Sequence, residues 1–313
     1  MSKSKSQREL EQLVEPFRVT NGKKFRLADV KTDDTGGIDS KDEGKERLAQ
    51  SVDRLCDLQK KLYAKNQWSL LAIFQGMDAA GKDGAIAHVM SGINPEGCEV
   101  HSFKAPSVEE LDHDFLWRTS VRLPARGRIG IFNRSYYEEV LVVRVHPEIL
   151  AGQKLPPRGK NGDSIWKERF ESINALERHL ERNGTAVVKF FLHLSKKEQK
   201  ARFLERLEEP DRRWKFSMGD VEERGHWSEY MAAYEDMIRH TSSEHAPWYV
   251  IPADNKWFAR LAVSGGILER IRGLGLEYPK IEGAAQRELA RVRRGLLGEK
   301  AARRRVTASR RGA

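Results

Sequence analysis

The sequence predicts an α/β fold in which helices cover both faces of a doubly wound, mostly parallel sheet. Short apolar runs that are typical of buried strands occur at residues 69–75, 97–103, 128–132, 186–194 and 248–251. The segments between them have helical spacing. In residues 43–65, for example, apolar side chains recur every three or four positions from Leu48 to Leu62. Strands that alternate with helices in this way form parallel sheets.

The remaining elements follow from periodicity and from capping signals. Further helices are predicted at residues 85–90, 107–120, 134–145, 164–182, 223–240 and 256–272. Ser107 and Ser195 each stand three residues before a glutamate, which is the spacing of a capping box. Residues 123–127 are predicted to form a turn and 151–163 a loop.

Composition divides the chain into three parts. Residues 1–42 are polar and broken by glycines, and we expect an extended N-terminal arm, mostly without a core of its own. Residues 43–280 are the main domain, and 281–313 a basic tail. Residues 287–313 contain ten Arg or Lys and two Glu, so they carry +8 of the chain's net charge of +10. A solvated, disordered tail is the simpler interpretation, and an anchor for a polyanion is the alternative.

Composition also excludes several classes of protein. No apolar run approaches the roughly 18 residues of a membrane span. The N-terminal residues MSKSKSQRELEQ lack the apolar core of a signal peptide. Cys56 and Cys98 do not have the spacing of a disulfide framework or a zinc site. We therefore predict a cytoplasmic protein without a membrane partner.

The most informative segment is WSLLAIFQGMDAAGKDG at residues 68–84. An apolar strand leads into Gly76-x4-Gly81-Lys82, and a helix-like segment follows, which is the context of a phosphate-binding P-loop. Glycines let backbone N–H groups surround phosphate oxygens, and the helix N-terminus adds positive potential. We expect Gly76, Ala79, Ala80, Gly81 and Lys82 to bind phosphate. A glycine-rich turn that binds nothing is the alternative.

Two acids distinguish this loop from an ordinary P-loop. Asp83 stands where a Ser or Thr usually holds magnesium, and Asp78 lies inside the loop itself. A carboxylate among phosphates is repelled unless a cation lies between them. Asp78 is therefore the best candidate for a ligand of Mg²⁺, with Mn²⁺ as a substitute. The sequence does not explain Asp83.

A second polar segment follows the apolar strand at 128–132. Ligands of doubly wound sheets bind beyond the carboxyl ends of the strands, so Asn133 and Arg134 are expected to share a crevice with the loop. Arg134 suits bidentate binding of phosphate, while Asn133 and Glu138 are candidate outer metal ligands. Helix capping and a solvated face are the alternatives for Asn133 and Glu138.

A lid is predicted at about residues 208–225, where a segment of charged and aromatic residues lies between two long helices. Arg212, Arg213 and Lys215 there are crowded against Trp214 and Phe216. Such cations can stabilise the charge on a phosphoryl group during its transfer. An ordinary surface loop is the alternative.

The segments GMDAAGKDG, LDHDFLWR, LPARGRIGIFNRSYYEEVLVVRVHP and RRWKFSMGD occur in this order, and together they resemble the polyphosphate kinase 2 family. The resemblance runs from about residue 43 to 272. The form FNRSYYEEVLVVRV is similar to the class that acts on both nucleoside mono- and diphosphates. Asp83 departs from the family pattern, in which many members have Gly.

The resemblance implies a P-loop, thymidylate-kinase-like domain with a helical lid and inorganic polyphosphate as the phosphoryl donor. It implies Walker A roles for Asp78 and Lys82, lid roles for Arg213 and Lys215, and a homo-oligomer, either dimer or tetramer. By resemblance Asp114 belongs to the nucleotide pocket, to which we add Arg118 and Glu138. A polyphosphate chain also needs a row of cations, for which we select Lys104, Arg134, Arg144 and Arg212.

We therefore predict Mg²⁺-dependent, reversible transfer of the terminal phosphoryl group of polyphosphate to AMP or ADP, with GMP and GDP as further acceptors. The catalytic residues would be Asp78, Lys82, Arg134, Arg213 and Lys215. Two alternatives remain: an ATP-dependent nucleotide or small-molecule kinase, and a nucleic-acid-binding protein that uses the basic tail. The nearly neutral body of the chain argues against nucleic acid as a partner.

Overall fold

The computed structural model describes residues 5–156, 164–211 and 213–309. The chain forms two compact units, Met1–Leu276 and Glu277–Ala313. The second unit consists of a connecting segment and one helix, α13 (Gly283–Ser309). Residues 157–163, in the predicted loop, and Arg212, in the predicted lid, lie outside the described residues.

A six-stranded sheet with the order β1-β6-β5-β2-β4-β3 forms the centre of the first unit. Its parallel strands are β2 (Ser69–Gln75), β3 (Cys98–Ser102), β4 (Ile129–Asn133), β5 (Thr185–His193) and β6 (Trp248–Pro252). The short β1 (Arg18–Val19) pairs antiparallel with β6. All seven residues of β2 are buried, as expected for a central parallel strand. The predicted α/β class with parallel pairing is confirmed.

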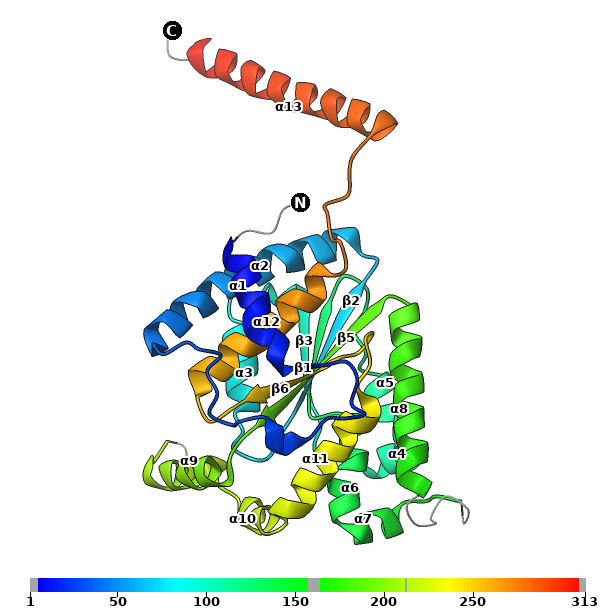
Figure 1. Ribbon diagram of the computed structural model, residues 1–313. Coiled ribbons are helices and arrows are strands. Elements are labelled where there is room, and N and C mark those ends of the chain that lie inside the picture. The colour runs from blue at the N-terminus through cyan, green and yellow to red at the C-terminus, as the bar shows by residue number, and fades with distance from the viewer. Residues whose placement is uncertain (1–4, 157–163, 212, 310–313) are drawn as a thin grey trace. The chain divides into compact units, whose positions relative to one another are not determined.

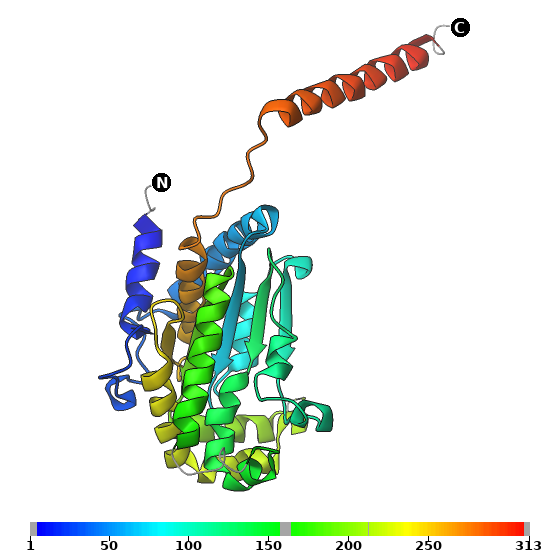
Figure 2. The ribbon, with the colours of Figure 1, turned by 90° about the vertical axis from the view of Figure 1, so that its right-hand side faces the viewer.

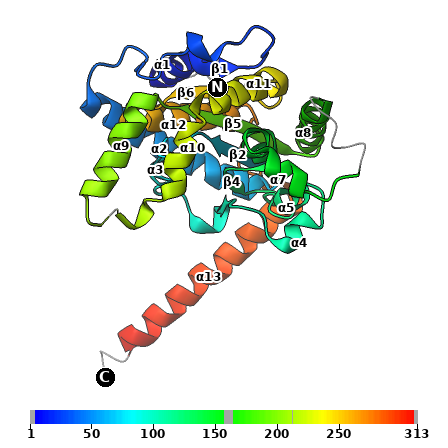
Figure 3. The ribbon, with the colours of Figure 1, turned by 90° about the horizontal axis from the view of Figure 1, so that it is seen from below.

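Helices cover both faces of this sheet (Figure 3). One face carries α1 (Lys5–Val14), α2 (Lys41–Lys65), α3 (Lys82–Val89) and α12 (Lys256–Arg272). The other carries α8 (Ser164–Arg182), α11 (Trp227–Thr241) and the 3₁₀ turn η4 (Tyr136–Val140). Successive side chains of a strand point to opposite faces, so Phe190 enters one core while Phe191 enters the other.

Several predicted helices are shorter or divided. The predicted helix at 107–120 is split into α4 (Val108–Leu111) and α5 (Trp117–Ser120), with the Ser107–Glu110 capping box in place. The one at 134–145 becomes η4 and α6 (Val142–Val145). A further helix, α7 (Pro147–Gly152), precedes and overlaps the start of the predicted loop. Ser195 caps α9 (Lys196–Glu208), and α10 (Met218–Gly225) occupies the predicted lid.

The N-terminal segment is not an extended arm. It contains α1, two 3₁₀ turns, η1 (Glu15–Phe17) and η2 (Leu27–Asp29), and the edge strand β1. Leu10 and Val14 belong to the main core, and a Cβ on Gly265 would lie 2.6 Å from the Val14 side chain. The glycine thus lets α1 pack closely against α12. The apolar side of α1 is buried in this contact, which the local sequence does not reveal.

The basic tail also differs from the prediction. A 27-residue helix, α13, occupies the region that we expected to be disordered. Its described apolar residues are all exposed, Leu289 and Leu296 being 51% and 57% accessible. Within the described residues, no helix has both the length and the apolar character needed to cross a membrane.

Candidate functional site

The glycine-rich loop connects β2 to α3 at the carboxyl end of the sheet (Figure 1). Gly76, Ala79 and Gly81 have φ angles of +153°, +61° and +101°. A Cβ on Gly76 would lie 3.0 Å from the carbonyl oxygen of Leu192 on the neighbouring strand. Glycine is required there because of this close approach and the positive φ. Gly81 then stands at the N-cap of α3, where the backbone N–H groups are free to bind an anion.

Two side chains of α9 hold this loop through its carbonyl groups. Gln199 Nε2 donates a hydrogen bond to the Asp78 carbonyl at 2.9 Å. Arg202 Nη1 donates to the carbonyls of Ala79 and Ala80 at 2.9 and 3.1 Å. Arg202 Nη2 also donates to the carbonyl of Ala253, at 2.6 Å, beyond the end of β6. These hydrogen bonds fix consecutive carbonyls of the loop and so support its strained conformation at Ala79.

Lys82 lies within the loop, with only 8% of its surface exposed. Its Nζ donates to the carbonyls of Gly76 and Met77 at 2.6 and 3.2 Å. Burial, aided by the positive charge of Arg134, lowers the pKa of Lys82 to about 8. A phosphate that enters the loop would oppose this shift and hold the lysine in its charged form.

Arg134 joins the loop to the next strand of the sheet. It follows β4 with φ of +63°, a backbone conformation unusual for arginine. Its Nη2 lies 2.7 Å from Asp78 Oδ1, and its Nη1 lies 3.5 Å from Glu138 Oε2. The negative charges of Glu138 and Asp78 raise the pKa of Arg134 against the effect of burial. The structure therefore brings together Asp78, Lys82, Arg134 and Glu138, as the strand order requires.

Asn133 pairs with the residue that the sequence did not explain. Its Nδ2 donates a hydrogen bond to Asp83 Oδ1 in the first turn of α3. This contact ties the end of β4 to the start of α3, so Asp83 has a partner within the protein. Asn133 presents its amide N–H₂ to an acid here and so helps to position Asp83. This bond does not use Oδ1, the atom through which an Asn binds a metal, so the ligand role of Asn133 stays a prediction.

Asp220 is a site residue that the sequence reasoning missed. It lies in the first turn of α10, where Arg206 Nη1 approaches its Oδ2 at 3.5 Å. Burial and the negative charge of Asp78 raise the pKa of Asp220. α10 thus carries a further acid close enough to Asp78 for the two charges to interact. Asp220 is the last residue of the motif RRWKFSMGD, but its position there does not distinguish it from a helix-capping acid.

The predicted lid leaves the sheet beside this site. α9 and α10 lie at the carboxyl end of the sheet (Figure 2), and between them the 3₁₀ turn η6 (Arg213–Lys215) carries the predicted lid cations. Arg213 is exposed and its Nε donates to the Leu207 carbonyl at 2.8 Å. The side chain of Lys215, like all of Arg212, lies outside the described residues. Arg224 at the end of α10 donates to Gln199 Oε1 at 2.9 Å, so the lid contacts the same glutamine that holds the loop.

The donor set at this site fits a divalent cation bound by oxygens. Gln75 is fully buried at the end of β2, and its Oε1 has no hydrogen-bond partner among the described residues. Its Nε2 donates to Glu138 Oε1 at 3.0 Å, which places the amide beside the acids. An orphaned buried oxygen next to carboxylates calls for a water or an ion. No three acidic, His or Cys residues of the described chain form a complete metal site, so the remaining ligands would be phosphate oxygens and water.

Other predicted site residues are engaged elsewhere. Arg118 is buried and donates to the Lys104 carbonyl at 2.9 Å, while Lys104 itself is exposed. Arg144 forms a 2.6 Å ion pair with Asp236. Asp114 is exposed and accepts a hydrogen bond from the Leu116 backbone N–H at 2.9 Å, just before α5. Arg118 and Arg144 thus have partners within the protein, and their ligand roles stay predictions.

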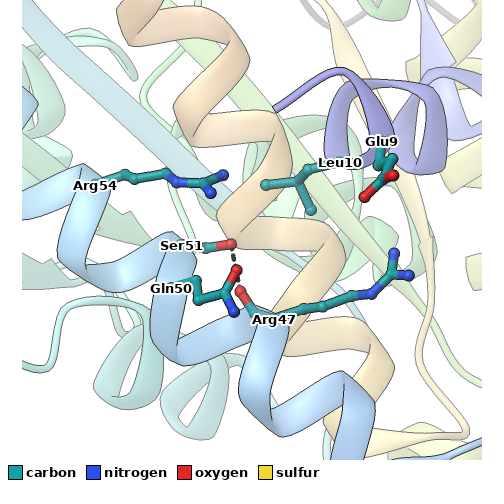
Figure 4. A pocket seen from close by; sticks show the side chains of 6 residues that line it. All are labelled: Glu9, Leu10, Arg47, Gln50, Ser51 and Arg54. Atoms are coloured by element: carbon teal, nitrogen blue, oxygen red, sulfur yellow. Dashed lines mark hydrogen bonds between the residues drawn. The ribbon is translucent and has the colours of Figure 1, made fainter. Parts of the chain in front are cut away.

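A recess of about 20 Å³ lies between α1 and α2, lined by Glu9, Leu10, Arg47, Gln50, Ser51 and Arg54 (Figure 4). Ser51 Oγ donates to the Arg47 carbonyl beside it. The recess holds one water molecule at most and contains no residue of the loop. It is a packing defect between helices and not a substrate site.

Comparison with known proteins shows which family has this site. The sequence model of the family described as polyphosphate kinase 2 matches residues 38–277. The chain belongs to the polyphosphate kinase 2 family. The matched region contains the loop, Arg134, Arg202 and Asp220, and it ends before α13. The resemblance predicted from four motifs is confirmed.

Individual relatives of this polyphosphate kinase 2 family member match over most of their length. An ADP-polyphosphate phosphotransferase of Rhodopseudomonas palustris is 55% identical over 90% of this chain and 97% of its own. An AMP/ADP-polyphosphate phosphotransferase of Meiothermus ruber is 44% identical over 88% of this chain and 98% of its own. A crystal structure of polyphosphate kinase 2 from Arthrobacter aurescens superposes with a TM-score of 0.80, at 42% identity, over 89% of this chain and 96% of that one.

Proposed function

We propose that the protein transfers the terminal phosphoryl group of inorganic polyphosphate to a nucleoside mono- or diphosphate, reversibly. The convergence of Lys82, Arg134 and Asp78 at the mouth of the glycine-rich loop carries this proposal. Relatives similar over nearly their whole length are named for the same chemistry. AMP and ADP are the expected acceptors, with GMP and GDP as further candidates.

Phosphoryl transfer depends on positioning and charge neutralisation more than on covalent chemistry. The acceptor is a phosphate oxygen that is already anionic near neutral pH, so the reaction needs no general base. The loop N–H groups and Lys82 would hold the phosphate chain, and Arg134 would exchange Asp78 for a phosphate oxygen. Arg213 and Lys215 would approach the site when the lid closes and excludes water.

Asp78 would hold the divalent cation, with Asp220 and Gln75 Oε1 as neighbouring oxygen donors. We propose Mg²⁺, with Mn²⁺ as a substitute, because the donors are oxygens and few are provided by the protein. Such a cation offsets the negative charge on the phosphate oxygens when it is bound. Asn133 Oδ1 stays a candidate outer ligand, because the hydrogen bond to Asp83 uses only the amide nitrogen of Asn133.

We also propose that the fold is of the thymidylate-kinase-like P-loop type. The glycine-rich loop follows β2, which lies inside the sheet between β4 and β5. The chain passes from β2 to β3 at one edge, returns to β4, and crosses β2 to reach β5 and β6. The loop therefore lies at the point where the strand order reverses, which is the binding site of doubly wound sheets. A cytoplasmic location and a dimer or tetramer remain predictions.

The test is a product profile. Purified protein is incubated with Mg²⁺, polyphosphate and AMP, ADP, GMP or GDP in turn, and each nucleotide product is quantified. Formation of ADP from AMP or ATP from ADP is expected. No phosphorylated nucleotide from any acceptor would refute the proposal. A second assay replaces polyphosphate by ATP as donor to a non-adenine acceptor. Product formed with ATP and not with polyphosphate would indicate an ATP-dependent kinase instead.

A further inference from the structure

α13 is a strongly basic helix that lies outside the stretch matched by the family model, residues 38–277. Its side chains are described through residue 298, and in that part Arg287, Arg291 and Arg294 are all exposed. Their spacing of four and three residues places them on one side of an α-helix. Leu289, Val292 and Leu296 lie on the opposite side by the same geometry. We call the first set the arginine face.

The arginine face is electrostatically unfavourable by itself. Cations at i, i+3 and i, i+4 repel one another and so weaken the helix. One acid, Glu288, lies 3.9 Å from Arg291, but both side chains are more than two-thirds exposed, so their pairing is weak. Gly295 and Gly298 further weaken the helix relative to alanine. A bound polyanion would remove the repulsion and favour the helix.

We infer that the arginine face binds the chain of polyphosphate away from its reacting end, an inference that rests on the proposed function. The charge pattern matches a linear polyanion. Arg287 to Arg294 spans about 10 Å along the helix axis at 1.5 Å per residue, room for several phosphate units with one negative charge each. Binding releases the counterions of the polyanion, so it is sequence-independent and salt-sensitive. Because α13 is covalently linked to the catalytic unit, it raises the local concentration of the donor.

This role predicts a dependence on donor length. A short donor such as tripolyphosphate fills the active site and leaves little for α13 to bind, whereas a long chain reaches both. Removing the arginine face therefore raises KM for long-chain polyphosphate and leaves KM for tripolyphosphate and kcat for either donor unchanged.

The experiment compares the full-length protein with the triple variant R287Q/R291Q/R294Q. The matched control is K23Q/K24Q/K31Q, which removes the same charge from exposed positions of the first unit. Initial rates are measured with tripolyphosphate and with chains of about a hundred units, from low to physiological salt. Direct binding is measured with fluorescent long-chain polyphosphate and, separately, with single-stranded RNA of similar charge.

We expect the arginine variant to raise KM for the long chain about tenfold at low salt and the control to leave it unchanged. The slope of log affinity against log salt should fall by about 2, at roughly 0.7 per lost cation as for single-stranded nucleic acids. Equal long-chain KM and binding in the variant and the wild type would overturn the inference. So would a loss of RNA binding alone, which would assign the face to nucleic acid. If the wild type uses neither donor, the proposed function has failed instead.

Discussion

The guanidinium of Arg134 lies 2.7 Å from the carboxylate of Asp78. The proposed metal ligand and the proposed phosphate ligand thus neutralise each other across the mouth of the loop. On the proposed function, substrate binding would separate them, because Asp78 would bind the cation and Arg134 a phosphate oxygen. The ion pair keeps both side chains aimed at the place where they will act, so little side-chain ordering is left to be done on binding.

Asp78→Asn should lower kcat by about two to three orders of magnitude, since loss of one preorganised electrostatic group typically costs about 2.7–4 kcal/mol. The amide keeps the shape of the side chain but lacks the charge that holds a cation. Mg²⁺ titration of the rate should also shift to higher concentration. Asp57→Asn, at an exposed position of α2, is the control. A normal rate and normal Mg²⁺ dependence in the Asp78 variant would remove Asp78 from the site.

The rate should depend on pH through Lys82. The pKa of this lysine is lowered to about 8 in the free protein, so its positive charge is present below that pH and is lost as pH rises through it. We expect kcat/KM for polyphosphate to fall above about pH 8. Lys82→Arg keeps a charge throughout, so its lower rate should show no such decline. An identical alkaline limb in both proteins would assign the limb to another group.

Arg202→Met should lower kcat at least tenfold although Arg202 is only 4% exposed and is proposed to contact no substrate. Without its hydrogen bonds the carbonyls of Ala79 and Ala80 lose their partners and the loop can relax. The thermal midpoint should also fall, and saturating polyphosphate should recover part of it because the ligand orders the loop. Lys200→Met, exposed on the same helix, is the control. Unchanged turnover would show that the loop holds its conformation without α9.

Substitutions in a buried ion pair beneath the site should have large effects on the free energy of unfolding. Lys189 Nζ lies 2.6 Å from Glu177 Oε2, both residues are fully buried, and Tyr136 and Tyr137 donate to the same carboxylate. Lys189→Met leaves a buried unpaired charge and should cost about 3–5 kcal/mol of unfolding free energy. Adding Glu177→Gln should recover part of the loss, because the amide is neutral and still accepts from the tyrosines. Urea denaturation measures the unfolding free energy of both variants. A double variant less stable than K189M would contradict this explanation.

Much of the site follows from local sequence. Gly76, Gly81 and Lys82 are recognisable because a short motif lies between an apolar strand and a helix, and Arg134 because it follows the next apolar strand. Gln199, Arg202 and Asp220 are not recognisable in this way. They lie in helices with ordinary charged faces, and they reach the loop only because α9 and α10 fold across the end of the sheet. Tertiary packing likewise determines the partners of Arg118 and Arg144, which are the Lys104 carbonyl and Asp236.

By itself the sequence determined the α/β class, the glycine-rich loop, the central cations and the family, because these depend on short-range periodicity and spacing. Only the tertiary structure decided that residues 5–42 pack onto the sheet, that Asp83 is paired with Asn133, and that α9 holds the loop from outside. Those contacts join residues far apart in the chain. Their energies depend on burial and on the geometry of hydrogen bonds, which exist only after the strands have taken their order.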